Sequence, residues 1–182
     1  MLERFRRRPL PPPVRAVQDR LAPGEQRLAA AAVAPGGDGA EWLVATTRAL
    51  WLPPADAAAD GGAPPQRLPW ERVAKAVWRE GVLAVTEAGA DGGPLADRTH
   101  AFRLVDPRGF PDAVHDRVTA SVVWSRHHRL RGRAGVRVLA RRTEHGQVVW
   151  TLVYDPGLDP GDADLAARAE ALLHDARVEL GI

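Results

Sequence analysis

Apolar and polar positions change their period along the chain, and this change separates predicted strands from predicted helices. Short stretches rich in Trp, Val and Thr, with turn signals about every eight to twelve residues, predict antiparallel strands. The expected strands are 27–34, 41–47, 49–52, 82–86, 99–105, 136–142 and 148–154, the last two forming a hairpin. Residues 67–78 fit a helical stripe as well as strand alternation, so both structures stay open for this segment.

Two segments have the helical period. Val114, Val118 and Val122 recur every four residues after a proline-containing start at Phe110, which predicts a helix there. A second run, 162–180, predicts an amphipathic helix that packs on a core. Its apolar face consists of Leu165, Ala169, Leu172, Ala176 and Leu180. Aspartates at its start, Arg177 near its end and Gly181 after it are typical of helix termini.

The pattern predicts an α+β chain organised in three parts. Residues 1–20 are rich in arginine and proline and predict a flexible tail. Residues 21–125 hold most strands and the first helix, and form the main domain. Residues 126–182 form a hairpin and helix extension that packs on the same core, with 126–135 as a charged loop before the hairpin.

Residues 25–125 resemble a bacterial PH-like, or GRAM-like, domain. The likeness rests first on Trp42-Leu-Val-Ala-Thr-Thr-Arg-Ala-Leu-Trp-Leu52, where the family has a strand, a tight Thr-x-Arg turn and a returning strand. Arg67-Leu-Pro-Trp70-Glu-Arg-Val73 is similar to the next family segment. Val82–Thr86 with Phe102–Leu104 is similar to its last hairpin, and the helix from Phe110 to the helix that plugs the barrel.

The resemblance implies an antiparallel β-barrel or roll with a helix, followed here by the C-terminal hairpin and amphipathic helix. Which of the two helices caps the barrel stays open. The family also implies a lipid-binding, peptide-binding or scaffolding module rather than an enzyme. Fold similarity alone does not carry a function across, so the ligand has to come from particular residues.

The residues that enzymes most often use are scarce. There is no cysteine, which excludes disulfides, thiol nucleophiles, cysteine-ligated zinc and iron–sulfur clusters. The two serines, Ser121 and Ser125, do not lie in a Gly-x-Ser-x-Gly turn. We therefore expect no enzyme activity and no cofactor.

Histidines and glycines give only weak signals. Asp112, His115 and Asp116 lie one turn apart on the predicted helix, a spacing that could hold a metal but is common by chance. His127 and His128 are expected in a solvated loop. The glycines of 36–39 precede a strand and not a helix, so they predict a hairpin turn instead of a phosphate loop. We expect no metal site.

Tryptophan is unusually frequent among the aromatic residues, with six against one tyrosine and three phenylalanines. Five of the six fall in or just before expected strands, where they are most simply core residues. They are Trp42, Trp51, Trp70, Trp78 and Trp150. The alternative is a platform on which bases stack, which requires exposed rings beside cations.

The charge balance is less basic than the isoelectric point of about 9.9 indicates, because the net charge is only +2. Lys75 is the only lysine, and few groups titrate between the carboxylates and the arginines. Nucleic-acid binding is therefore not expected. The preference for arginine and alanine indicates a GC-rich bacterial genome.

Arginines nevertheless gather in two places and give the one candidate anion-binding set. Residues 126–142 contain seven arginines and no acid, while 155–182 contain seven acids and two arginines. The candidates are Arg4, Arg6, Arg7, Arg8, Arg126, Arg129, Arg131 and Arg133. They either form a face for an anionic partner, including weak contact with an anionic membrane surface, or are neutralised by the acidic C-terminal segment.

The longest apolar run, Leu28–Ala34, has seven residues, against roughly twenty for a membrane span. The N-terminus lacks the pattern of a signal peptide, so we expect a cytoplasmic protein. The leading hypothesis is a non-catalytic binding or scaffold module, with an unknown protein as the partner. The alternative is an anion-binding module for membrane lipid or nucleic acid, which would use the segment Arg126–Arg142 and the N-terminal arginines.

Overall fold

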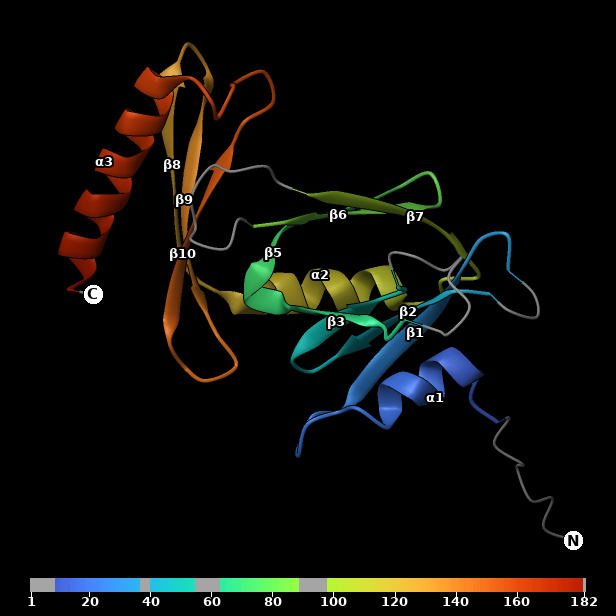
Figure 1. Cartoon of the computed structure of the whole chain (residues 1–182). Coiled ribbons are helices and arrows are strands. Elements are labelled where there is room, and N and C mark those ends of the chain that lie inside the picture. Colours follow the sequence, from blue (N-terminus) through green and yellow to red (C-terminus); the bar gives the residue numbers. More distant parts are fainter. Residues whose placement is uncertain (1–8, 37–39, 55–62, 89–97, 182) are drawn as a thin grey trace, which may run out of the picture.

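The computed structural model describes residues 9–36, 40–54, 63–88 and 98–181. Within these residues the chain forms an open antiparallel sheet of seven strands, an antiparallel sheet of three strands, and three α-helices. Figure 1 shows helix α3 on one side of the smaller sheet and the larger sheet, with helix α2, on its other side. The predicted α+β class is confirmed.

The larger sheet has the strand order β4-β3-β2-β1-β7-β6-β5. Its strands are β1 (Arg27–Val33), β2 (Trp42–Thr46), β3 (Ala49–Leu52), β4 (Gln66–Pro69), β5 (Val73–Arg79), β6 (Val82–Glu87) and β7 (Thr99–Val105). The end strands β4 and β5 do not pair, so the expected barrel is not closed. They are separated by the 3-10 turn η1 (Trp70–Arg72), and α2 (Phe110–Ser121) packs against β1, β5 and η1.

The hairpin predicted for 41–52 is confirmed, with Arg48 next to the turn. The buried Thr46 fixes this turn, because its hydroxyl accepts hydrogen bonds from the backbone N–H of Arg48 at 3.2 Å and of Ala49 at 2.9 Å. The same hydroxyl donates to the buried carboxylate of Glu25. A short polar residue in an apolar strand thus determines where the chain reverses.

Both faces of the β2–β3 hairpin are buried, which explains its nearly continuous apolar sequence. Alternate side chains face α2 or helix α1 (Pro12–Gln18), whose Val14 and Val17 pack against Val44 and Trp51. The prediction of a tail over 1–20 is therefore wrong for α1. The arginine- and proline-rich composition of this segment indicated a tail, although it contains Val14 and Val17 at helical spacing, and both are buried. Residues 1–8 lie outside the described residues.

The ambiguous segment 67–78 forms strands and one 3-10 turn instead of a helix. Trp70 is buried as expected, and its indole N–H donates to the carbonyl of Thr46 at 3.0 Å. The predicted burial of Trp78 is wrong, because this side chain is 39% exposed. It lies near the end of β5, the last strand of the sheet, so no strand covers its outer side.

The smaller sheet consists of β8 (Val122–Arg131), β9 (Ala134–Arg142) and β10 (Val148–Tyr154), in the order β10-β9-β8. The predicted hairpin and the predicted last helix, α3 (Ala163–Leu180), are both confirmed. The predicted loop over 126–135 is wrong, because most of it is strand β8. Arginines are compatible with an edge strand, where charged side chains reach water and discourage pairing with other chains.

The buried residues form separate clusters. One cluster joins the larger sheet to α2, and a second joins the smaller sheet to α3 through Val136, Val138 and Ala140 on one face of β9. The second cluster begins beyond residue 121, so the extension has a core of its own. The expected boundary at residue 125 falls inside β8.

Arg141 connects the two units. Its side chain is only 2% exposed and lies on the face of β9 opposite to α3. The guanidinium donates to the carbonyl of Ala74 in β5 at 3.1 Å, the carbonyl of Val118 at 3.0 Å and the hydroxyl of Ser121 at 2.6 Å. Within the described residues no carboxylate lies within 4.0 Å of it. Burial lowers the pKa of Arg141 to about 10, so it stays charged at neutral pH.

The first testable prediction concerns Gly135, which faces the backbone of β8. A Cβ on this residue would lie 1.9 Å from the carbonyl oxygen of His128, which no rotamer change relieves. We expect Gly135→Ala to lower the free energy of unfolding by at least about 2 kcal/mol, as overpacking does. Urea unfolding measures this. Gly161→Ala is the control, since the nearest atom to its added Cβ is a carboxylate oxygen of the exposed Asp159 at 3.2 Å, a side chain that can rotate away. Equal stability of the two variants would contradict the β8–β9 register.

The second prediction concerns the buried cation. Arg141→Lys keeps a buried charge but cannot reach all three acceptors, so we expect a loss of about 2–4 kcal/mol at neutral pH. Burial lowers the pKa of the new amine in the folded protein below its value in the unfolded chain. Between these two pKa values the unfolded chain holds more protons than the folded protein, so the free energy of unfolding of the variant increases as pH rises. Urea unfolding at several pH values between neutrality and pH 9 tests this.

The control for this experiment is Arg142→Lys at the exposed neighbouring position, where we expect a change within about 0.5 kcal/mol. An Arg141→Lys protein as stable as the wild type at neutral pH would show that the buried hydrogen bonds contribute little. A loss that does not recover with rising pH would show that the charge is not desolvated.

Candidate functional site

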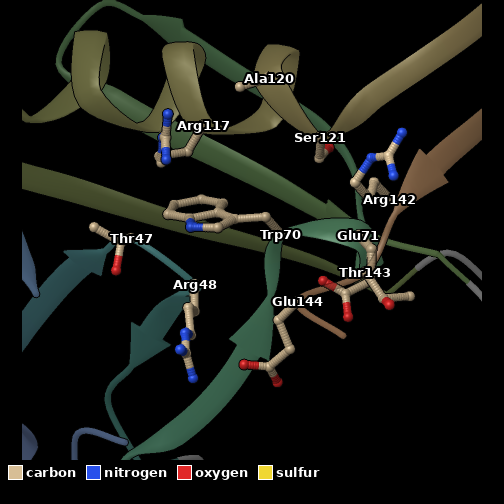
Figure 2. Close-up of a pocket in the computed structure, with 10 residues that line it drawn as sticks. All are labelled: Thr47, Arg48, Trp70, Glu71, Arg117, Ala120, Ser121, Arg142, Thr143 and Glu144. Atoms are coloured by element: carbon tan, nitrogen blue, oxygen red, sulfur yellow. The ribbon is translucent and has the colours of Figure 1, made fainter. Parts of the chain in front are cut away.

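A groove lies where the two units meet, next to Arg141. We call it the junction groove; its volume is about 320 Å³. It is lined by Thr47, Arg48, Trp70, Glu71, Arg117, Ala120, Ser121, Arg142, Thr143 and Glu144. Figure 2 shows residues of α2 along one side, the β2–β3 turn on another and the β9–β10 turn on a third, around the ring of Trp70.

Fixed turns position two of the three arginines of the groove. Arg48 follows Thr46, whose hydroxyl holds the β2–β3 turn, and the carbonyl of Arg48 accepts from the Trp70 N–H at 3.3 Å. Arg142 precedes a turn in which the N–H of Thr143 donates to the carbonyl of Gln147 at 2.8 Å. The backbone at both positions is therefore ordered before any ligand arrives.

The third arginine comes from the end of α2. Arg117, Ala120 and Ser121 share one face of this helix, as their spacing of three and four residues requires. Ser121 also touches the core, because its hydroxyl donates to the Val118 carbonyl at 2.7 Å and accepts from Arg141. The buried guanidinium of Arg141 therefore lies directly behind a residue of the groove wall.

Two carboxylates also line the groove, and one of them is already paired. Glu144 accepts from Arg67 of β4 at 2.8 Å, a contact that also fastens the β9–β10 turn to the larger sheet. Arg67 lies 4.0 Å from the buried Glu25. Glu71 has no cation within 4.0 Å in the described part of the chain, and neither Arg48, Arg117 nor Arg142 has a carboxylate within that distance there.

The arginines singled out from the sequence lie elsewhere, along β8 and after it. Arg126 forms a two-pronged pair with Glu179 of α3, at 2.7 and 2.9 Å, and also lies over the ring of Trp124. The pair lowers the pKa of Glu179 and raises that of Arg126. Arg131 donates to Asp162 at 3.1 Å. The acidic C-terminal segment thus pairs with two of these four arginines.

The other candidate arginines are not brought together into one site. Arg129 and Arg133 are exposed, and no carboxylate of the described residues lies within 4.0 Å of either. Arg4, Arg6, Arg7 and Arg8 lie outside the described residues. An anion-binding role for this set stays a prediction.

A second hollow, of about 260 Å³, lies between β5 and the start of α2. Its lining is mostly apolar and consists of Ala76, Trp78, Leu83, Pro111, Asp112, Val114 and His115. Beside it, Val77 is 37% exposed on the outer face of β5. This hollow therefore adjoins both an exposed tryptophan and the free edge of the larger sheet. We call this surface the β5 edge.

The histidine and tryptophan signals resolve in different ways. Within the described ranges no group of three or more His, Asp or Glu side chains could hold a metal ion. His127, expected in a loop, lies on β8 and hydrogen-bonds the carboxylate of Asp155 at 2.8 Å. That contact and the N–H of Gly135 lower the pKa of Asp155.

Trp51, Trp70 and Trp150 are buried, as the core interpretation predicts.

Little in the sequence indicated the junction groove. Arg141 follows the buried apolar residues Val138, Leu139 and Ala140 and is itself buried, while the other arginines of β9, Arg137 and Arg142, are exposed. A charged residue directly after this apolar run was the signal available in the sequence. Arg48, Arg117 and Arg142 are far apart in the chain, and only the docking of the two units places them around one groove.

The groove offers guanidinium donors, hydroxyl groups and the carboxylate of Glu71, which has no cation within 4.0 Å among the described residues. No histidine is among the residues that line it. In the part of the chain that the structure describes, no helix is long and apolar enough to cross a membrane. Comparisons with protein-family models, curated proteins and solved structures found no match.

Proposed function

We propose that this protein is a non-catalytic binding module with a PH-like arrangement, and that the β5 edge docks an extended segment of a partner protein. The observation that carries the proposal is Trp78, a large apolar side chain on an edge strand that is left 39% exposed beside the hollow between β5 and α2. Exposed aromatic side chains at the rim of a pocket are typical anchors of protein interfaces.

The arrangement of the larger sheet supports the PH-like part of the proposal. Its β2–β3 hairpin turns at Thr46 and Arg48, β4 leads through Trp70 into β5, and β6 pairs with β7 as a hairpin. Helix α2 lies between the two halves of the open sheet (Figure 1). These are the elements that the resemblance implies, in the order that it implies.

The free edge of β5 supports docking by strand addition. Within the described residues, β5 is the last strand of its sheet and β6 is its one pairing partner. The Ala74 carbonyl at its start is occupied by Arg141, so the open backbone is that of 75–79. A peptide added to such an edge gains main-chain hydrogen bonds, while pockets beside the edge select its side chains.

Charge and shape indicate what the partner segment contains. Lys75, Val77 and Arg79 alternate along β5 and are exposed, while Ala76 and Trp78 face the hollow. Arg79 has an ion pair with Glu80, but both side chains are about 80% exposed, so this pair competes weakly. The edge fits an extended segment in which apolar and acidic residues alternate.

Selection from a displayed library of random peptides tests the proposal. We expect enrichment of peptides that alternate apolar and acidic residues. Trp78→Ala should weaken the selected peptides by about thirtyfold, as the loss of a central aromatic anchor of about 2 kcal/mol does. Fluorescence anisotropy of labelled peptides measures the affinity.

Val178→Ala is the matched control, because Val178 is 68% exposed on α3, which packs on the smaller sheet and not on β5. Its peptide affinities should equal those of the wild type. Selection of no peptide above background, or equal binding by the Trp78→Ala protein, would contradict the proposal.

A further inference from the structure

The strands that end the two sheets are protected unequally. In the part of the chain that the structure describes, these strands are β4, β5, β8 and β10. Proteins protect such edges with charged side chains, proline, bulges or a short strand. β4 is four residues long and contains Arg67 and Pro69. β5 carries a lysine and an arginine and has a bulge, and β8 carries three arginines and has two bulges.

β10 has none of these protections. Its seven residues, Val148–Tyr154, include no charged residue and no proline, and its pairing with β9 is free of bulges. Valine, tryptophan, threonine and tyrosine, which make up most of it, all favour strands. A long, regular and uncharged edge of this kind readily pairs with a further strand.

The ladder between β9 and β10 shows which backbone groups of β10 face outward. The N–H of Asp155 donates to the carbonyl of Gly135 at 2.9 Å, so this pair is hydrogen-bonded. Hydrogen-bonded and non-hydrogen-bonded pairs alternate along an antiparallel ladder. The residues that direct their N–H and C=O groups away from β9 are therefore Val148, Trp150, Leu152 and Tyr154. Within the described residues, these outward groups form no hydrogen bond.

An added strand would not disturb the packing of the smaller sheet. Helix α3 packs mainly on β9, the middle strand, and so lies over a face of the sheet and not beside its edge. The side chains of Trp150 and Leu152 are already buried in the cluster beneath α3. The open part of β10 is thus its backbone, which a further strand can reach while these side chains stay in place.

The absence of charge makes β10 suited to pairing with itself. Like charges directly opposite each other destabilise a strand pair. A β5 or β8 strand paired with its own copy would bring lysine or arginine side chains together, whereas two β10 strands bring no charges together. Antiparallel pairing about a twofold axis at Thr151 places Trp150 opposite Leu152 of the second copy. It also places Val148 opposite Tyr154, so all four outward residues of each copy are used.

We infer that the protein forms a symmetric homodimer in which β10 pairs with β10 of a second copy. The two smaller sheets then become one continuous sheet, and the same surface of each copy forms the interface. This interface lies on the smaller sheet and does not depend on the peptide docking proposed for the β5 edge.

Sedimentation equilibrium of the full chain is the first test. One chain has a mass of 19.7 kDa, and we expect a species of twice this mass that dissociates on dilution. A mass of one chain at concentrations up to about 1 mM, where even a weak dimer forms, would overturn the inference.

Charge variants show whether a dimer uses β10. Val149 and Val153 are half-buried and, in the inferred register, lie opposite each other across the axis. Val149→Glu with Val153→Glu places like charges in contact, so we expect the dissociation constant of the dimer to rise at least about tenfold. Val149→Glu with Val153→Lys is the matched control, because it places opposite charges at the same contacts.

We expect the control variant to dimerise at least about tenfold more tightly than the variant with two glutamates. Equal dissociation constants of the two variants would show that the copies meet elsewhere and would overturn the inference. Circular dichroism of both variants shows whether the fold is retained.

Cysteine cross-linking tests the register, since the chain has no cysteine of its own. The two copies of Thr151 form a non-hydrogen-bonded pair at the axis, with Cα atoms about 4.5 Å apart, which a disulfide can span. Oxidised glutathione should therefore link Thr151→Cys chains into a covalent dimer on a non-reducing gel. The control is Val153→Cys, which lies opposite Val149 of the second copy and should link far more slowly. Equal rates of linking, or no covalent dimer of Thr151→Cys, would contradict the inferred pairing.

Discussion

The structure depends on one buried cation that has no carboxylate within 4.0 Å among the residues that the structure describes. The guanidinium of Arg141 leaves β9, enters the space between the two sheets and bonds to oxygens of β5 and α2. A charge in such a place is costly unless its donors are used. Its hydrogen bonds therefore fix the angle at which the smaller sheet meets the larger one, and that angle creates the groove.

Because of this docking, each of the two units supplies different parts of the candidate sites. The larger sheet supplies the free edge at β5 and the turn that carries Arg48, while the smaller sheet supplies the turn that carries Arg142. The ion pair between Arg67 of β4 and Glu144 also links the β9–β10 turn to the larger sheet. Neither unit alone contains all the side chains that line the junction groove.

Local chemistry made much of the fold predictable. A few adjacent residues determine each of the elements that were predicted correctly. These elements are the turn at Thr46 and Arg48, the hairpin around Gly146, and the ends of α3 at Asp162 and Gly181. The failures involve partners distant in sequence. The arginines of β8 indicated a loop because nothing local shows that β9 pairs with them, and Trp78 indicated burial because nothing local makes β5 the last strand.

The candidate sites were harder to predict for the same reason. Arg126 and Arg131 stood out in the sequence, yet acids of the C-terminal segment pair with them. Arg48 and Arg117 did not stand out, because a single arginine in a turn or on a helix has no signature of its own. Arg141 is the buried one of the three arginines of β9, and a buried charge next to an apolar run is the kind of local conflict that marks special positions.

Native-state amide hydrogen exchange tests most directly the claim that the two units behave as one body through Arg141. The exchange of β2–β3 amides reports on the larger sheet, and that of β9–β10 amides on the smaller one. The account predicts that the slowest amides of both hairpins open with the same free energy, and that Arg141→Lys lowers both together. A β9–β10 hairpin that opens on its own at lower free energy in the wild type, unaffected by Arg141→Lys, would contradict it.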